Sequence, residues 1–147
     1  MKAVRHARDL RKGRHSESGR IYLVTAVTLH RQRVFDDLPA ARILIRVLRR
    51  EQELGRARTL SFVVMPDHLH WLLELGADAD LSVVVRAVKA LTAKRLGGTI
   101  WQRGFHDHAV RRDEDLLTIA RYVVANPLRA GLVQRLTDYP HWDAIWL

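Results

Sequence analysis

Apolar and polar residues alternate along this chain with two periods, a period of two typical of strands and a period near 3.6 typical of helices. Runs rich in β-branched and aromatic residues predict four strands, at 21–29, 60–65, 68–75 and 101–110. Capping residues, glycines and amphipathic runs predict three helices, at 37–55, 83–96 and 113–126. This order predicts an α+β fold: a ferredoxin-like split βαβ (βαββαβ) with an antiparallel sheet and an added C-terminal helix carrying Tyr122.

Local signals mark the ends of the helices and the limits of the domain. Asp37 is predicted to cap the first helix, and Asp80 or Ser82 the second. Residues 1–20 carry seven Lys and Arg against two acids and little periodicity, which predicts a basic N-terminal arm. We expect 21–147 to form a single domain whose aromatic C-terminal segment wraps the body.

The second and third predicted strands form a hairpin around a Pro66-Asp67 turn. Positions two apart share one face of a strand, so His68 and His70 point the same way. The other face is apolar throughout, as a core-facing side requires, and consists of Leu69, Trp71, Leu73 and Leu75. Two imidazoles above a sealed apolar face make half of a metal site.

The last predicted helix carries a narrow polar stripe centred on Tyr122. At about 100° per residue, the polar residues within about 40° of the tyrosine are Asp115, Thr118, Asn126 and Arg129. Tyr122 and Asn126 are one turn apart, so the phenol and the amide can reach one point together. Pro127 is expected to end or kink the helix at Asn126.

These side chains together predict metal-assisted chemistry on phosphate. The amide oxygen of Asn126 is a hard ligand, suited to Mg²⁺ or Mn²⁺ beside the imidazoles of His68 and His70. A metal with open positions can polarise a phosphate oxygen while a hydroxyl attacks phosphorus. Tyr122 would supply that hydroxyl, activated by a nearby cation or by the metal.

The same residues also have purely structural explanations. An H-x-H pair on a strand, a tyrosine on a helix or an Asn-Pro helix end is each common without any function. A second pair, His106 and His108, also alternates on one predicted strand face and could supply the ligands instead. No complete apolar register backs that second pair, so His108 is expected to line the site or to contact DNA.

Composition narrows the classes of partner and of chemistry. The chain has 25 Lys and Arg against 16 Asp and Glu, a formal net charge of +9, which favours a polyanion, with nucleic acid ahead of a membrane surface. The absence of cysteine excludes disulfides, thiolate catalysis and cysteine zinc sites. No apolar run approaches the roughly 18 residues that a membrane span needs. A cytoplasmic protein fits these features.

Three separated motifs resemble one known family. They are H-L-H after M-P-D, then W-Q-R-G-F-H-D-H-A-V-R-R-D-E-D-L, then A-R-Y-V-V-A-N-P-L-R-A-G-L-V. In sequence and spacing they resemble the REP-associated tyrosine transposases, which are single-tyrosine HUH transposases of bacterial insertion sequences. The resemblance runs in uninterrupted order over roughly 19–139.

The resemblance implies a role for each residue of the predicted site. Tyr122 matches the nucleophile, His68 and His70 the HUH histidines, and Asn126 the third metal ligand. The family implies cleavage of single-stranded DNA without ATP, through a covalent 5′-phosphotyrosine and a free 3′-hydroxyl. Its substrates are expected to be palindromic repeats that fold as hairpins. The resemblance also implies a bacterial cytoplasmic protein associated with the nucleoid, and it favours a monomer over a homodimer. The alternative is a catalytically silent module that binds and regulates hairpin DNA.

Basic residues spread along the chain are the expected DNA contacts. On the arm, candidates for tetranucleotide or hairpin contact are Arg5, Arg8, Arg11, Lys12 and Arg14. In the body, candidates for DNA contact are Arg86, Lys89, Arg103, His108, Arg111, Arg112 and Arg129. For each of them, ordinary surface charge is an equally good explanation.

Overall fold

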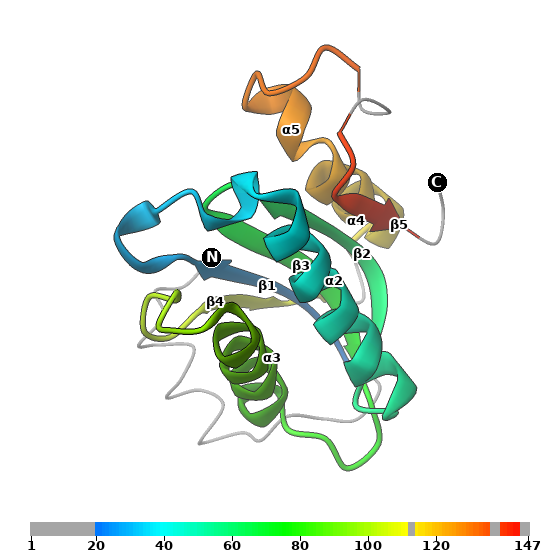
Figure 1. Cartoon of the computed structure of the whole chain (residues 1–147). Coiled ribbons are helices and arrows are strands. Elements are labelled where there is room, and N and C mark those ends of the chain that lie inside the picture. The colour runs from blue at the N-terminus through cyan, green and yellow to red at the C-terminus, as the bar shows by residue number, and fades with distance from the viewer. Residues whose placement is uncertain (1–19, 112–113, 136–138, 145–147) are drawn as a thin grey trace.

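The computed structural model describes residues 20–111, 114–135 and 139–144 (Figure 1). Its strands are β1 (Ile21–Val27), β2 (Ala57–Met65), β3 (His68–Leu75), β4 (His106–Ala109) and β5 (Trp142–Ala144). Its helices are α2 (Leu38–Glu53), α3 (Leu81–Leu96), α4 (Leu116–Val124) and α5 (Asn126–Arg129). Two short 3₁₀ turns, Leu29–Arg31 and Val34–Asp36, connect β1 to α2.

The five strands form one antiparallel sheet in the order β4-β1-β3-β2-β5. The first four strands in this order, together with the crossover helices α2 and α3, make the predicted split βαβ arrangement, which is confirmed. Met65 and His68 are paired across the end of the β2–β3 hairpin, so Pro66 and Asp67 form its turn as predicted.

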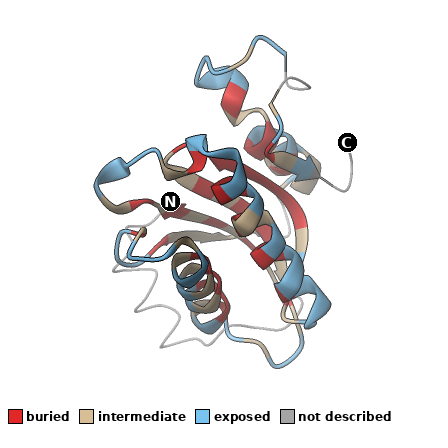
Figure 2. Cartoon of the chain, viewed as in Figure 1, coloured by how far each residue is buried: buried red, intermediate tan, exposed pale blue. Residues whose placement is uncertain are grey.

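One face of the sheet packs against α2 and α3 and holds the main core. The four apolar residues predicted to face inward on β3 are almost fully buried there: Leu69, Trp71, Leu73 and Leu75. The indole Nε1 of Trp71 donates to Oγ1 of Thr59 at 2.9 Å, so this large ring is buried without losing its hydrogen bond. Figure 2 shows buried residues along the strands and on the helix faces that meet the sheet.

Each long helix begins at a carboxylate that accepts hydrogen bonds from free backbone N–H groups. Asp37 accepts from Ala40 at the start of α2, as predicted. Asp80, rather than Ser82, caps α3. Asp115 is the N-terminal cap of α4, so this helix begins later than the predicted residue 113. Asp115 therefore precedes the helix and is not part of its polar stripe.

The predicted strand at 101–110 is wrong in its first half. Trp101 makes only an isolated bridge to Thr28, and regular pairing with β1 begins at His106. Gly104 lies between them with φ at 73°, a left-handed conformation that interrupts an extended chain. Nζ of Lys89 donates to the carbonyls of Gln102 and Gly104 at 2.8 and 2.6 Å, which holds this loop against α3.

The C-terminal segment adds a strand that the sequence did not predict. β5 pairs with β2, and Val64 donates its backbone N–H to the carbonyl of His141 at 2.8 Å. The phenol of Tyr139 donates to the carbonyl of Val64 at 2.6 Å. The described part of this segment therefore lies along the edge of the sheet, and three residues are too short to read as a strand by period.

The second face of the sheet carries the predicted site. α4 covers part of this face, where Leu60, Leu72 and Ala120 form a small core between helix and sheet. His68 and His70 lie on this same face of β3. In the described part of the chain, no helix has both the length and the apolar character that crossing a bilayer requires.

Candidate active site

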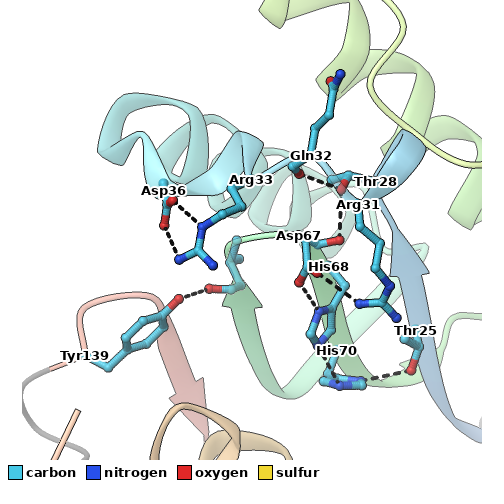
Figure 3. A network of polar contacts seen from close by, with 11 residues as sticks. Thr25, Thr28, Arg31, Gln32, Arg33, Asp36, Asp67, His68, His70 and Tyr139 are labelled. Atoms are coloured by element: carbon cyan, nitrogen blue, oxygen red, sulfur yellow. Dashed lines mark hydrogen bonds and ion pairs between the residues drawn. The ribbon is translucent and has the colours of Figure 1, made fainter. Parts of the chain in front are cut away.

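His68 and His70 point to one place above the sheet (Figure 3). Their Nε2 atoms are 3.1 Å apart, and the two rings stand nearly perpendicular, with their centroids 4.7 Å apart. The burial of His70, followed by the charges of His68 and Arg129, lowers its pKa to about 3. His70 is therefore neutral at physiological pH, the form that can bind a metal.

The other nitrogen of each ring meets a partner that fixes its orientation. Nδ1 of His68 is 2.7 Å from Oδ1 of Asp67, and Nδ1 of His70 is 2.9 Å from Oγ1 of Thr25 (Figure 3). Arg31 donates to the second oxygen of Asp67 at 2.9 Å. Burial alone would raise the pKa of Asp67, but the hydrogen bonds of His68 and Arg31 outweigh it and lower that pKa. The carboxylate therefore stays ionised beside His68.

Backbone contacts fix the turn that presents Asp67. Thr28 donates both its N–H and its hydroxyl to the carbonyl of Asp67, at 2.9 and 3.0 Å. Phe35 donates its N–H to the carbonyl of Pro66 at 3.0 Å. These hydrogen bonds hold the turn against the chain segment that follows β1. They therefore restrict the position of the Asp67 carboxylate, which orients His68.

This donor set fits a divalent ion. Two nitrogens that meet one ion at right angles, each about 2.1 Å from it, lie about 3.0 Å apart. The observed separation of the two Nε2 atoms is 3.1 Å. Among the described residues, no three His, Cys, Asp or Glu side chains gather closely enough to hold a metal. Within the described residues, a third protein ligand beside the two histidines would be of another type, such as the amide of Asn126.

Tyr122 and Asn126 reach the same region from the helical side. A cavity of about 260 Å³ opens between the sheet and α4, and its lining residues are Leu23, Thr25, His70, His106, Tyr122, Val123 and Asn126. α4 ends at Val124, and α5 begins at Asn126, next to Pro127, where the sequence predicts the helix to end or kink. The structure thus brings His70, Tyr122 and Asn126 to one cavity, with His68 beside His70.

Arg129 lies on the ring of Tyr122 rather than apart from it. The guanidinium carbon is 3.7 Å from the centroid of the phenol ring, a cation–π contact. The charge of Arg129 also contributes to the lowered pKa of His70, which places it within electrostatic reach of both halves of the site. The sequence predicts Arg129 as a DNA contact and as part of the polar stripe around Tyr122, and the structure adds the contact with the phenol ring.

Exposure distinguishes Tyr122 from the other tyrosines of the chain. Tyr22 is 5 % exposed and belongs to the core, whereas Tyr122 is 59 % exposed. The hydroxyl of Tyr139 is engaged with the carbonyl of Val64. Of these three phenols, Tyr122 has the greatest access for a large substrate.

The second histidine pair is divided between two surroundings. His106 lines the cavity with Tyr122, whereas Nε2 of His108 is 3.0 Å from both carboxylate oxygens of Glu114. Sequence reasoning considered His106 only as an alternative ligand. Alternation within β4 indicated that His106 shares a face with His108, but no local sequence signal gave the register by which β1 aligns His106 with His70.

The other predicted DNA contacts have different positions. Arg86, Arg103 and Arg111 are exposed. The ammonium of Lys89 binds two loop carbonyls, and burial lowers its pKa. The remaining candidates lie outside the described residues, and they are Arg5, Arg8, Arg11, Lys12, Arg14 and Arg112.

A comparison with protein-family models identifies the family. The model described as "Transposase IS200 like" matches residues 17–126, which include β1 to α4 and end at Asn126. The chain belongs to the IS200-like transposase family. The match includes both histidines, the tyrosine and the asparagine of the candidate site.

Relatives within this transposase family agree with the motif resemblance. A REP-associated tyrosine transposase from Escherichia coli (strain K12) is 35% identical over 83 residues, which are 54% of this chain and 50% of that protein. A second relative, from Haemophilus influenzae, is 27% identical over 99 residues, 56% of each chain. The resemblance to REP-associated tyrosine transposases is confirmed. The chain spans about half the length of the curated relatives that it matches.

A solved structure has the same fold. It is the structure of a REP-associated tyrosine transposase bound to a REP hairpin, with a TM-score of 0.76 and 24% sequence identity. The match covers 88% of this chain and 79% of that chain. The likeness confirms the α+β fold with its antiparallel sheet.

Proposed function

We propose that this transposase cuts and rejoins single-stranded, hairpin-bearing DNA, with Tyr122 as the nucleophile and a divalent metal held by His68, His70 and Asn126. The observation that carries this proposal is the shared cavity of His70, Tyr122 and Asn126, which come from β3, α4 and α5. The Nε2 atom of His68 faces that of His70 at 3.1 Å. Nucleophile and metal ligands therefore meet on one face of the sheet.

Tyr122 attacks the phosphorus of one phosphodiester. The bond from its phenolic oxygen to phosphorus forms, and the bond from phosphorus to the 3′ oxygen breaks. The products are a 5′-phosphotyrosine and a free 3′-hydroxyl, and the reverse attack by a 3′-hydroxyl rejoins the strand. One phosphodiester is exchanged for another, so no ATP is required.

His68, His70 and Asn126 would hold Mg²⁺ or Mn²⁺ through two imidazole nitrogens and one amide oxygen. When bound, the ion would polarise a non-bridging oxygen of the scissile phosphate. Asp67 and Thr25 hold the two rings with their Nε2 atoms together. These contacts orient the ligand nitrogens before substrate arrives.

Arg129 supports the nucleophile. Its guanidinium packs on the phenol ring of Tyr122, so a positive charge lies over the ring that carries the attacking oxygen. A cation in this position attracts the phosphate that approaches the tyrosine. The role of Arg129 as a general DNA contact is compatible with this placement.

The proposed substrate is a hairpin with a single-stranded flank. The net charge of +9 suits a polyanion, and the structural neighbour with the same fold is bound to a REP hairpin. The cavity is lined by β3 and α4 of one chain, which favours a monomer with a complete site. A strand transferase acts where the chromosome is, so we place this protein at the nucleoid of a bacterial cell.

Covalent capture tests this function. A pool of single-stranded stem-loop oligonucleotides with randomised flanks is labelled at the 3′ end, incubated with the protein and Mg²⁺ or Mn²⁺, and separated by denaturing electrophoresis. The label should move with the protein, because the 3′ fragment keeps the phosphate joined to tyrosine. Sequencing of the captured strands gives the cleavage position. Salt-sensitive hairpin binding without any adduct would support a silent binding module instead.

A further inference from the structure

We propose that His106 is a further catalytic residue, which protonates the 3′ oxygen of the DNA as this oxygen leaves phosphorus. The proposal rests on the proposed function and adds a residue to the same cavity. His106 comes from β4, a different strand from the metal-binding histidines. It lines the cavity together with Tyr122.

The reaction needs a proton at this position. The phenol of Tyr122 loses one proton when it bonds to phosphorus, and the 3′ oxygen gains one when its bond to phosphorus breaks. Protons and electrons therefore balance without an additional reactant. The pKa of an alcohol is close to that of water, about 15.7, so an unprotonated 3′ oxygen is a poor leaving group. A side chain that delivers the proton typically accelerates such a step about 10²–10⁴-fold.

The cavity offers few side chains that can carry the proton. Apart from the nucleophile, two lining residues have acid–base side chains, His70 and His106. Both ring nitrogens of His70 are engaged, Nδ1 with Thr25 and Nε2 with His68. Among the described residues, no hydrogen bond engages the ring of His106, which lines the same cavity as Tyr122.

The register of the sheet places His106 across the cavity from the metal ligands. Thr25 on β1 pairs with His70 on one side and with His106 on the other. Neighbouring strands are about 4.8 Å apart, so the backbones of His106 and His70 lie about 10 Å apart, with Thr25 between them, and the two side chains share one face. That distance leaves room for a phosphate between them, with Tyr122 above it on α4.

His108 provides a matched comparison on the same strand. It lies two residues further along β4 and on the same face, but its Nε2 is 3.0 Å from the carboxylate oxygens of Glu114. His108 is thus engaged outside the cavity that holds Tyr122. A substitution there disturbs β4 without removing a proton donor from the cavity.

A substrate with a sulfur leaving group tests the role of His106 directly. Two versions of the captured hairpin are made, one natural and one with sulfur in place of the 3′ oxygen at the mapped cleavage position. A thiol has a pKa of about 8.5, so its thiolate leaves without protonation. We expect His106→Gln to lose about 100-fold or more in the rate of adduct formation on the natural DNA. On the sulfur substrate it should match the parent within about threefold.

Several outcomes would overturn the proposal. An equal loss on both substrates would assign His106 to DNA binding or to packing, and no loss on either would remove it from the reaction. His108→Gln, whatever its activity, should show the same ratio of sulfur to oxygen rates as the parent. His106→Asn repeats the test in a second variant, with hairpin affinity as the check of folding. A parent that forms no adduct on natural DNA refutes the proposed function itself.

Discussion

The Nε2 atoms of His68 and His70 lie 3.1 Å apart, and each ring is oriented through its opposite nitrogen by a different side chain. Asp67 belongs to the hairpin turn, and Thr25 belongs to the neighbouring strand β1. The two nitrogens that we propose as metal ligands are thus held together by contacts within the protein. Such preorganisation removes part of the cost of assembling a metal site.

Replacement of Asp67 by Asn should weaken metal binding. The amide keeps the size of the side chain but loses the negative charge that holds a proton on Nδ1 of His68. With the proton on Nδ1, the lone pair of Nε2 can bind the ion. Loss of such an outer partner typically costs 10–100-fold in affinity. Titration with Mn²⁺, monitored by electron paramagnetic resonance, measures the metal affinity of the variant and of the parent. Asp36→Asn, which removes a surface pairing with Arg33, is the control and should leave the affinity unchanged.

Asn126 should contribute one oxygen ligand. Asn126→Ala removes that oxygen, so we expect weaker Mn²⁺ binding and slower adduct formation, by about tenfold or more. Asn126→Asp keeps an oxygen at the same place and should restore much of the affinity. Equal affinity of the alanine variant and the parent in the same titration would exclude Asn126 from the metal site.

Arg129 should affect the chemical step more than DNA binding. Arg129→Gln removes the charge from the ring of Tyr122, and we expect adduct formation to slow about tenfold while hairpin affinity changes less than threefold. Single-turnover rates and filter-binding affinities separate the two effects. Arg121→Gln, an exposed position on the same helix, is the control. A large loss of affinity with an unchanged rate at saturation would instead make Arg129 a plain DNA contact.

Alkaline pH should loosen the C-terminal segment. Burial, followed by the charge of Asp36, raises the pKa of Tyr139 to about 12. Since this folded value lies above the ordinary value of about 10, the stability that the neutral phenol contributes is complete below pH 10 and disappears as pH rises through 12. The urea midpoint should therefore fall more between pH 9.5 and about 11.5 in the parent than in Tyr139→Phe. Equal slopes would contradict this account.

Much of the fold could be predicted because local periods and caps agree with the tertiary structure. The alternation in β3 indicated both its buried register and its histidine face, and Asp37 is the cap of α2. The strand predicted from Trp101 failed because Gly104 and the contacts of Lys89 hold a loop there. β5 could not be predicted, since its pairing depends on an edge of β2 that exists only after folding.

The candidate site was predictable where one element carries it. Spacing within a strand and within a helix placed His68 beside His70 and Tyr122 near Asn126. Thr25 and His106 belong to the site because β1 pairs with both β3 and β4, which are distant from it in the sequence. No period in the sequence carries that register.

The most direct measurement is the identity of the residue bonded to DNA. After capture with a cleavable hairpin and nuclease trimming, mass spectrometry of the peptides locates the attached nucleotide. We predict a nucleotide joined through its 5′-phosphate to Tyr122, and no adduct with Tyr122→Phe. A nucleotide on Tyr22, on Tyr139 or on another residue, or an adduct that persists in Tyr122→Phe, would contradict the account.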